Sequence, residues 1–496
     1  MVDTTDPQTE VERTTTGGAP RQAVAWVSAV MAAVAGSCLV GIGRRPLWLD
    51  ESLSVGATTQ LVDTWRFTGG TMAAYYAVLT PWIAVSHDRV WIRALSLVFA
   101  LAVLPVTYWI ARQFAGRWEA LLATALLGGS WTFTRYAQEA RSYALAMLLT
   151  TLAWALLVRW VRTPLGTRRA TRYQVLYTVL IVAALLAHGL TGLQVLAQIV
   201  AVGLLDDRSR RLRALVPSLL ACMATLGLLS SAGAAEVANW IPPLSLHQLG
   251  EVLEAFTGPH VVVRLLLGAG IVAGATVAVR RFQQDHSHGA WLYGALTAWA
   301  FVPPVLLILL SVVRPYLLAR YVIGSLPAVA MLLVLSLRTL GDRTTARAAL
   351  GVVLVVAVVA GRISLHDEPY DDWAGVAQAV AADARHDDLI AFPTQTIRPA
   401  FDFAWSEIDA ETAPRAISPV GPLGTVHRMY PYHDDPQVPA LLAEEAPPRI
   451  WVVGDETVGR GDTMTPFLDD VRLGDYEVTL RQNFDGGLAV VLLERT

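Results

Sequence analysis

Residues 290–313 read AWLYGALTAWAFVPPVLLILLSVV, a run of 24 residues without a charged side chain. A helix rises about 1.5 Å per residue, so a helix of this length crosses the roughly 30 Å hydrocarbon core of a bilayer. The 496-residue chain is 54% hydrophobic and 16% charged, against about 25% charged residues in a soluble domain. This composition excludes a disordered chain and an ordinary soluble enzyme, and it predicts an α-helical integral membrane protein. The sequence contains eleven predicted spans, at 22–43, 91–111, 118–134, 142–161, 173–188, 190–205, 213–233, 261–279, 290–313, 317–337 and 347–361.

The charge of the chain changes sign near residue 362. Residues 1–361 carry a net charge of +11 and residues 362–496 a net charge of −14, although the whole chain has a formal charge of only −3. In the acidic part, a helix-like stretch at 373–384 follows Asp371 and Asp372, which are typical N-terminal caps. Apolar stretches bounded by turn residues indicate buried strands, so we expect a small α/β domain. The predicted strands are 388–393, 449–454 and 488–493.

Arginines recur in every second connection between the predicted spans, sixteen of them in all. Short cytoplasmic loops carry an excess of basic residues. This phase predicts a multi-pass plasma-membrane protein with a cytoplasmic N-terminus and, because the number of spans is odd, an extracytoplasmic C-terminal domain. The polar first residues show no apolar pattern and are expected to be disordered. The predicted organisation is a cytoplasmic N-terminus (1–21), a membrane domain (22–361) whose first outside loop is 44–90, and an extracytoplasmic α/β domain (362–496).

The strongest signal for chemistry is Leu47-Trp48-Leu49-Asp50-Glu51-Ser52-Leu53-Ser54, in the first outside loop. Two adjacent carboxylates at a membrane face are costly unless they are hydrated or paired. Neighbouring side chains point in different directions, so Asp50 and Glu51 would do different work. One carboxylate would accept a proton from a substrate hydroxyl, and the other would orient the acceptor or hold a divalent cation. The alternative that the sequence leaves open is a solvated cap of the helix that follows.

Two further clusters place arginine outside, against the positive-inside trend. They are Thr134-Arg135-Tyr136-Ala137-Gln138-Glu139-Ala140-Arg141-Ser142-Tyr143 and Arg314-Pro315-Tyr316-Leu317-Leu318-Ala319-Arg320-Tyr321. Guanidinium groups bind phosphate oxygens through charge-assisted hydrogen bonds, so each cluster predicts a phosphate site. If the first run is helical, Arg135 and Glu139 share one face. The alternatives are a local Glu–Arg pair at the interface for the first cluster and an interfacial Arg/Tyr belt for the second.

Weaker candidates are Tyr75, Arg93, His188 and Trp240. For the aromatic residues the alternative is an interface anchor, and for the histidine it is a satisfied structural residue. The chain contains no lysine, so all 38 basic residues are arginine and no lysine can serve as a phosphate ligand or Schiff base. Because the arginines follow the membrane topology, no nucleic-acid partner is predicted.

The motif Leu47-Trp48-Leu49-Asp50-Glu51 resembles the acidic first-loop motif of the GT-C superfamily of membrane glycosyltransferases. The run Tyr136-Ala137-Gln138-Glu139-Ala140-Arg141-Ser142-Tyr143 is similar to the Gln-Glu-x-Arg-x-Tyr pattern of its protein-O-mannosyltransferase-like branch (glycosyltransferase family 39-like), which includes the bacterial aminoarabinose transferases. Ala319-Arg320-Tyr321 with Leu326-Pro327-Ala328 resembles a late-helix pattern of that branch, and Val90-Trp91-Ile92-Arg93-Ala94-Leu95-Ser96 resembles its second span. The resemblance covers about residues 22–340.

The resemblance implies an inverting enzyme that moves a sugar of the mannose or arabinose type from a polyprenyl-phosphate donor to a hydroxyl of a lipid, glycan or protein. It places Asp50 as general base, Glu51 as an aid to the acceptor or to a divalent cation, and Arg141 and Arg320 on the lipid phosphate. No other cofactor is expected. The further predicted substrate-binding residues are Arg135, Glu139, Tyr143, Tyr321, Tyr75, His188 and Trp240.

The first loop departs from the family pattern at one point. Many members carry His-Pro-Pro before Leu-Tyr-Tyr, whereas Thr71-Met72-Ala73-Ala74 precedes Tyr75-Tyr76 in this chain. The missing histidine could help to bind a metal ion or the substrate. Its absence therefore bears on the identity of the donor and on the use of a metal more than on the class of reaction. Two other classes of function remain. A transporter or flippase would place ionisable groups near the bilayer midplane and show an internal repeat, and neither is found. A receptor-like scaffold for envelope assembly would need no cavity beside Asp50.

Overall fold

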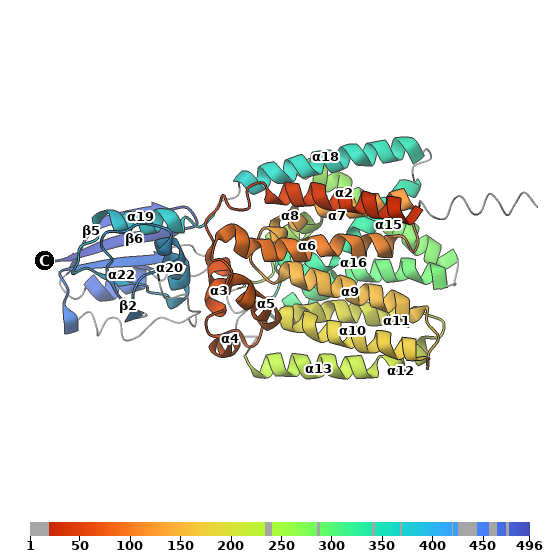
Figure 1. The fold of residues 1–496 in the computed structure, drawn as a ribbon, viewed down its shortest axis with the longest axis horizontal. Coiled ribbons are helices and arrows are strands. Elements are labelled where there is room, and N and C mark those ends of the chain that lie inside the picture. The colour runs from red at the N-terminus through yellow and green to blue at the C-terminus, as the bar shows by residue number, and fades with distance from the viewer. Residues whose placement is uncertain are drawn as a thin grey trace, which may run out of the picture.

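The computed structural model describes residues 19–233, 241–284, 288–339, 343–367, 370–418, 420–424, 444–455, 464–472 and 476–496. Long helices lie side by side in one bundle, and a sheet-containing domain built from the C-terminal residues sits at one end of it (Figure 1). Three short helices of the first loop lie at that same end, between the bundle and the sheet (Figure 1). We call this end of the bundle the sheet end.

Each of the eleven predicted spans overlaps at least one helix of the bundle. Among the described residues, seven helices are long and apolar enough to cross a membrane, and shorter apolar helices accompany them. Together with the apolar surface that the bundle exposes, this confirms the predicted α-helical, multi-pass membrane fold. The helices are α2 (Ala19–Leu39), α6 (Arg89–Ala111), α7 (Arg117–Gly129), α9 (Tyr143–Val161), α10 (Arg168–Ala187), α11 (Gly192–Gly203), α13 (Val216–Ser231), α15 (Val261–Gln284), α16 (His288–Val313), α17 (Leu326–Ser336) and α18 (Arg343–Asp367), joined in part by α12 (Arg208–Ala214), α14 (Leu246–Thr257) and the 3-10 turns η1 (Gly189–Thr191), η3 (Ala319–Ser325) and η4 (Leu337–Thr339).

Small residues let the helices of the bundle approach closely, as is usual in membranes. At Gly274 of α15, an added Cβ would collide with the backbone of Leu332 in α17. At Gly324 in η3, an added Cβ would meet the Gln194 side chain of α11 at 2.9 Å. The second contact fixes η3, which carries Arg320, against the helix that follows His188.

The first loop folds into α3 (Leu49–Ala57), α4 (Leu61–Thr68) and α5 (Ala73–Ile83). The chain turns between α4 and α5 through Gly69 and Gly70, whose φ angles are 59° and 75°, a region that glycine enters without steric cost. The buried rings of Tyr75 and Tyr76 join a core with residues of α3, α6 and α9. The first loop is therefore a packed layer at the sheet end.

The C-terminal residues form a six-stranded sheet in the order β3-β2-β1-β4-β6-β5. Strand β1 pairs in parallel with β2 and β4, and the remaining pairs are antiparallel. Trp373 and Phe401 come from α19 (Trp373–Asp383) and α20 (Arg398–Ser406) and form the core on one face. Leu468 of α22 (Met464–Arg472) packs on the other face. The strands are β1 (Leu389–Ala391), β2 (Arg415–Ser418), β3 (Val420–Gly421), β4 (Arg449–Asp455), β5 (Tyr476–Phe484) and β6 (Leu488–Arg495), so the expected helix and three buried strands are present.

Several helix ends differ from the sequence prediction, and two of the differences concern the third and the last predicted spans. The third predicted span, 118–134, is broken at Ser130, whose hydroxyl accepts a hydrogen bond from the Phe133 N–H at 3.3 Å and caps a new helix, α8 (Trp131–Ala137). The last helix of the bundle extends past residue 361 to Asp367. Local capping and packing, which hydropathy does not report, decide both ends.

Candidate functional site

The acidic motif forms the first turn of α3 at the sheet end of the bundle. Carboxylates are favourable there, because the first N–H groups of a helix have no intrahelical partner and the helix dipole is positive. Consecutive side chains of a helix point about 100° apart, and Asp50 and Glu51 accordingly contact different groups. The two carboxylates belong to two clusters, which are described in turn.

The Glu51 cluster consists of Glu51, Arg93 of α6 and the backbone of Ala140. Arg93 donates to Glu51 through Nε to Oε1 at 2.8 Å and through Nη2 to Oε2 at 2.6 Å. The Ala140 N–H donates to Oε1 at 2.8 Å, and the Trp48 N–H lies 3.4 Å from Oε2. Glu51 is 1% exposed. Glu51 therefore caps α3 as a buried, paired carboxylate and not as the solvated cap that the sequence left open.

Arg93 also holds the chain that leads into α3. Its Nη1 donates to the carbonyls of Ile42 at 2.6 Å and Arg45 at 3.0 Å, and its Nη2 donates to the carbonyl of Pro46 at 2.9 Å. This anchoring role was not predicted. The signal was a single arginine inside an apolar span, a position at which an ionisable residue needs a specific partner.

The Asp50 cluster consists of Asp50, Arg141 and Arg320. The Asp50 Oδ2 lies 3.7 Å from Arg141 Nη2 and 3.6 Å from Arg320 Nη1. These are ion pairs longer than ordinary hydrogen bonds, and the Asp50 side chain is 21% exposed. The structure thus brings together the acidic motif and both arginine clusters, which are far apart in sequence.

The guanidinium group of Arg141 is only partly engaged in hydrogen bonds. Its Nη1 donates to the Asp50 carbonyl at 3.0 Å and to Ser54 Oγ at 3.2 Å. Its Nε is buried and makes no hydrogen bond. The Arg141 carbonyl lies 3.3 Å from Ser96 Oγ, which in turn lies 3.3 Å from the hydroxyl of buried Tyr75. Tyr75 thus supports the backbone of Arg141 from behind.

Glu139 lies buried beside these clusters, with an Oε1 that makes no hydrogen bond. Burial raises the pKa of Glu139 to about 7, against the opposing effect of nearby Arg135. The expected shared helical face of Arg135 and Glu139 is wrong, because α8 ends at Ala137. Gln138 leaves the helix and donates to the Cys38 and Val40 carbonyls at 2.5 and 3.1 Å. Arg135 lies over the Trp131 ring, with its Cζ 5.3 Å from the ring centroid.

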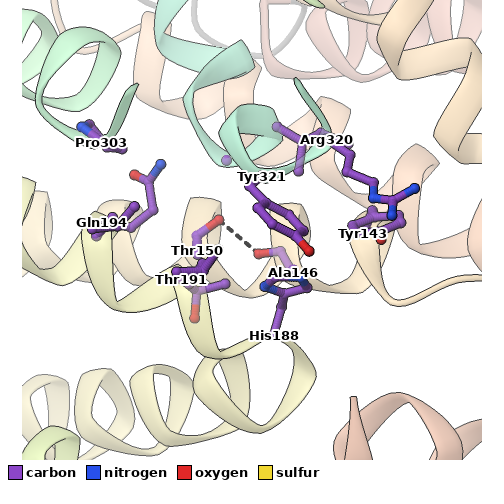
Figure 2. Close-up of a pocket in the computed structure, with 13 residues that line it drawn as sticks. Tyr143, Ala146, Thr150, His188, Thr191, Gln194, Pro303, Arg320 and Tyr321 are labelled. Atoms are coloured by element: carbon purple, nitrogen blue, oxygen red, sulfur yellow. Dashed lines mark hydrogen bonds between the residues drawn. The ribbon is translucent and has the colours of Figure 1, made fainter. Parts of the chain in front are cut away.

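A pocket opens behind Arg320. Figure 2 shows Tyr143, His188, Arg320 and Tyr321 grouped on one side of it and Gln194 on the other. The centroid of the His188 ring lies 4.7 Å from that of Tyr321 and 5.8 Å from that of Tyr143. The Arg320 Cζ lies 5.8 Å from the centroid of the Tyr143 ring. The remaining lining residues include Thr150 and Thr191, whose hydroxyls add polar groups to the aromatic wall.

The residues beside Asp50 do not fit the divalent cation that the sequence left open. Two guanidinium cations flank the Asp50 carboxylate, and Arg93 occupies both oxygens of Glu51. In the described part of the chain, no three His, Cys, Asp or Glu side chains are grouped as metal ligands. We therefore derive no step through a metal ion.

One predicted residue of the described chain lies elsewhere. Arg314 is exposed, and its guanidinium lies over the Tyr316 ring at 5.6 Å, so it is Arg320 alone that brings the second arginine cluster to Asp50. Trp240 lies outside the described residues.

The sequence matches no protein-family model and no curated protein. The structure, in contrast, is similar to the crystal structure of ArnT from Cupriavidus metallidurans in the apo state, with a TM-score of 0.60 at 14% identity over 95% of this chain and 98% of that one. It is also similar to the same protein bound to undecaprenyl phosphate, with a TM-score of 0.58 at 14% identity over 94% and 98% of the two chains.

A third similar structure is the archaeal oligosaccharyltransferase AglB from Archaeoglobus fulgidus in complex with an inhibitory peptide and a dolichol-phosphate. The TM-score is 0.53 at 11% identity, and the match covers 87% of this chain and 69% of that one. Both proteins have the GT-C architecture of a helical membrane bundle with a sheet-containing C-terminal domain. The chain described here has the GT-C fold.

Proposed function

We propose that the chain is a membrane glycosyltransferase that moves a sugar from a polyprenyl-phosphate donor to a hydroxyl acceptor, with Asp50 as general base and Arg141 and Arg320 as the phosphate site. The sheet end would face the extracytoplasmic side and the N-terminus the cytoplasm, as the arginine distribution indicates. Support from related folds comes from ArnT, which was crystallised with undecaprenyl phosphate, and AglB, which was solved with a dolichol-phosphate.

The observation that carries the proposal is the loose contact of one carboxylate with two arginines. At 3.6 and 3.7 Å, Asp50 balances the charge of Arg141 and Arg320 without closing their hydrogen bonds. A phosphodiester carries a full negative charge and accepts paired hydrogen bonds from guanidinium groups. Donor binding would therefore take the arginines over from Asp50. The carboxylate, released from its counter-ions, would then be able to accept the proton of the hydroxyl acceptor.

The proposed reaction is one displacement. The acceptor oxygen loses its proton to the Asp50 carboxylate and forms a bond to the anomeric carbon of the sugar. The bond between that carbon and the phosphate oxygen breaks, and the electron pair leaves with the polyprenyl phosphate. Arg141 and Arg320 stabilise the charge that develops on the leaving phosphate. A single displacement inverts the anomeric configuration.

The cavity behind Arg320 is the proposed place of the sugar. It adjoins the phosphate site through Arg320 and Tyr143, and its wall combines aromatic rings with Gln194 and threonine hydroxyls, groups that contact the faces and the hydroxyls of a sugar ring. The sugar proposed there is of the mannose or arabinose type that the resemblance implies.

Two predicted residues receive narrower roles in this proposal. Glu51 orients α3 and the loop at Ala140 instead of touching the acceptor, because its oxygens are already bonded. Glu139 is a buried carboxylate near the phosphate site whose charge changes near neutral pH. The acceptor would approach Asp50 from its exposed side, as the hydroxyl of a lipid, glycan or protein.

The proposal is tested by incubating the purified full-length protein, in lipid nanodiscs, with a panel of radiolabelled polyprenyl-phosphate sugars and a membrane extract as the source of acceptors. We expect one labelled sugar to move to an acid-stable product, and we expect no product from the Asp50→Asn variant. Failure of every donor to give product, or equal product from the variant, would contradict the proposal.

A further inference from the structure

The C-terminal domain contacts the helix that carries Asp50. The Asp371 Oδ2 lies 3.4 Å from the N–H of Leu49, the first residue of α3. Asp371 is 8% exposed. The first N–H groups of a helix have no partner within the helix, so a carboxylate from 322 residues further along the chain caps α3 from outside. The sequence predicted an N-terminal cap at Asp371 and Asp372, and the two residues serve different helices: Asp372 caps α19 by accepting from the Gly375 N–H at 2.9 Å.

We propose that Asp371 is a positioning residue, by which the C-terminal domain fixes the first turn of α3 and so holds Asp50 between its two arginines. The proposal rests on the transferase function given above. It assigns the C-terminal domain a part in the chemistry of the membrane site, through one hydrogen bond that ends a single residue before the reacting carboxylate.

Asp371 is itself fixed by the sheet. The turn between β5 and β6 passes directly behind it, and an added Cβ at Gly486 would lie 2.7 Å from the Asp371 Cα. Gly486 has a φ of 84°, which favours glycine. The neighbouring Asp372 N–H donates to the Asp485 carbonyl at 3.1 Å. The position of the cap thus depends on the far hairpin of the sheet.

Apolar packing supports the same junction. Leu49 and Leu53 of α3 are buried in the domain core with Trp373 and Phe401. In return, Phe403 of α20 is buried in the first-loop core, the core that also holds the tyrosine rings behind Arg141. An ion pair between Arg89 and Glu407, 3.0 Å long and partly exposed, lies at the rim.

These contacts have a direct consequence for Asp50. Its carboxylate lies at 3.6 and 3.7 Å from the two arginines, a balance that small movements of α3 alter. A displacement of about 1 Å in a catalytic group commonly costs about 100-fold in rate. Removing the Asp371 cap frees the Leu49 N–H and loosens the first turn of α3, while Ser96 still holds the Arg141 carbonyl and Arg320 stays on η3.

The test compares three variants of the full-length protein in nanodiscs. Asp371→Ala removes the cap, Asp371→Asn keeps an oxygen that accepts from Leu49, and Asp372→Ala removes the neighbouring cap of α19 as a matched control. Two kinds of measurement are made: amide hydrogen exchange in the segment 47–57, and the kinetics of sugar transfer, expressed as kcat and donor KM.

We expect Asp371→Ala to speed exchange in 47–57 by about tenfold and to lower kcat by about 10- to 100-fold, with the donor KM within about threefold of the unmodified protein. Asp371→Asn should restore both quantities. Asp372→Ala should speed exchange in α19 and leave α3 and kcat unchanged.

Unchanged exchange in 47–57 for Asp371→Ala overturns the proposal, and so does an equal loss of kcat in Asp372→Ala. If Asp371→Ala does not fold, a normal kcat in the folded Gly486→Ala variant, which must displace Asp371, has the same meaning. If the unmodified protein transfers no sugar, the proposed function fails, and the exchange data still decide whether Asp371 holds α3.

Discussion

The Glu51 cluster and the Asp50 cluster lie on two sides of one helical turn and differ in how completely their charges are paired. Arg93 meets Glu51 at 2.6 and 2.8 Å, and the pair is buried. Asp50 meets its arginines at 3.6 and 3.7 Å, and Arg141 Nε and the nearby Glu139 Oε1 make no hydrogen bond. Closed pairs of this kind hold a structure in place, whereas open, partly desolvated groups remain able to bind a ligand. The difference separates the scaffold from the proposed reaction centre.

The largest expected effect concerns the open cluster. Asp50→Asn keeps the shape of the side chain and removes its basicity, so transfer should fall by about 10²- to 10⁴-fold, the usual contribution of a general base. Thermal stability in detergent should be preserved, because the ion pairs of the carboxylate with Arg141 and Arg320 are 3.7 and 3.6 Å long. Initial rates with the labelled donor and the unfolding midpoint check both parts. A stable variant with full activity would remove Asp50 from the chemistry.

In the Glu51 cluster, by contrast, we expect a substitution to lower the stability of the protein. Glu51→Gln leaves the buried Arg93 guanidinium without its counter-ion, which typically costs about 3–5 kcal/mol. We expect a lower unfolding midpoint and reduced yield. The double variant Glu51→Gln with Arg93→Met should recover part of that stability, since it removes the uncompensated charge. A midpoint equal to that of the unmodified protein would show that the pair is not a structural anchor.

The phosphate site gives the next largest effect. Arg141→Ala and Arg320→Ala should each raise the donor KM by about 10- to 100-fold, because a hydrogen bond to a charged group contributes about 1.5–3 kcal/mol. Arg314→Ala is the matched control, as this arginine comes from the same sequence cluster but is exposed. Equal donor KM values for all three variants would contradict the assignment of the phosphate to the Asp50 cluster.

The smallest effect is a pH dependence. Burial raises the pKa of Glu139 to about 7, so the carboxyl group is neutral below that pH and negative above it. The added charge lies near Arg320 and would oppose the donor phosphate, so the donor KM should rise a few-fold between about pH 6 and pH 8. In Glu139→Gln the KM should be flat over the same range. A rise of equal size in that variant would exclude Glu139 as its cause.

The sequence predicted the helical membrane bundle, because apolar runs long enough to span a bilayer have few other folded states. It also predicted the buried strands β4 and β6 and the α19 helix. It further predicted the three polar clusters, which place charged side chains at the outer edge of the membrane. These features are local: they depend on the length, hydropathy and capping of short segments.

Only the tertiary structure decided which polar groups meet. It paired Asp50 with Arg141 and Arg320, gave Glu51 to Arg93, ended α8 before Glu139, and placed Asp371 on the first N–H of α3. The pairings of Asp50, Glu51 and Asp371 each join residues that are distant in the chain, and the energy of a charged group depends on partners within a few ångströms rather than on its sequence neighbours. The sequence by itself therefore determined where charges lie along the membrane, and the fold determined which of them form short, buried pairs and which form longer ion pairs.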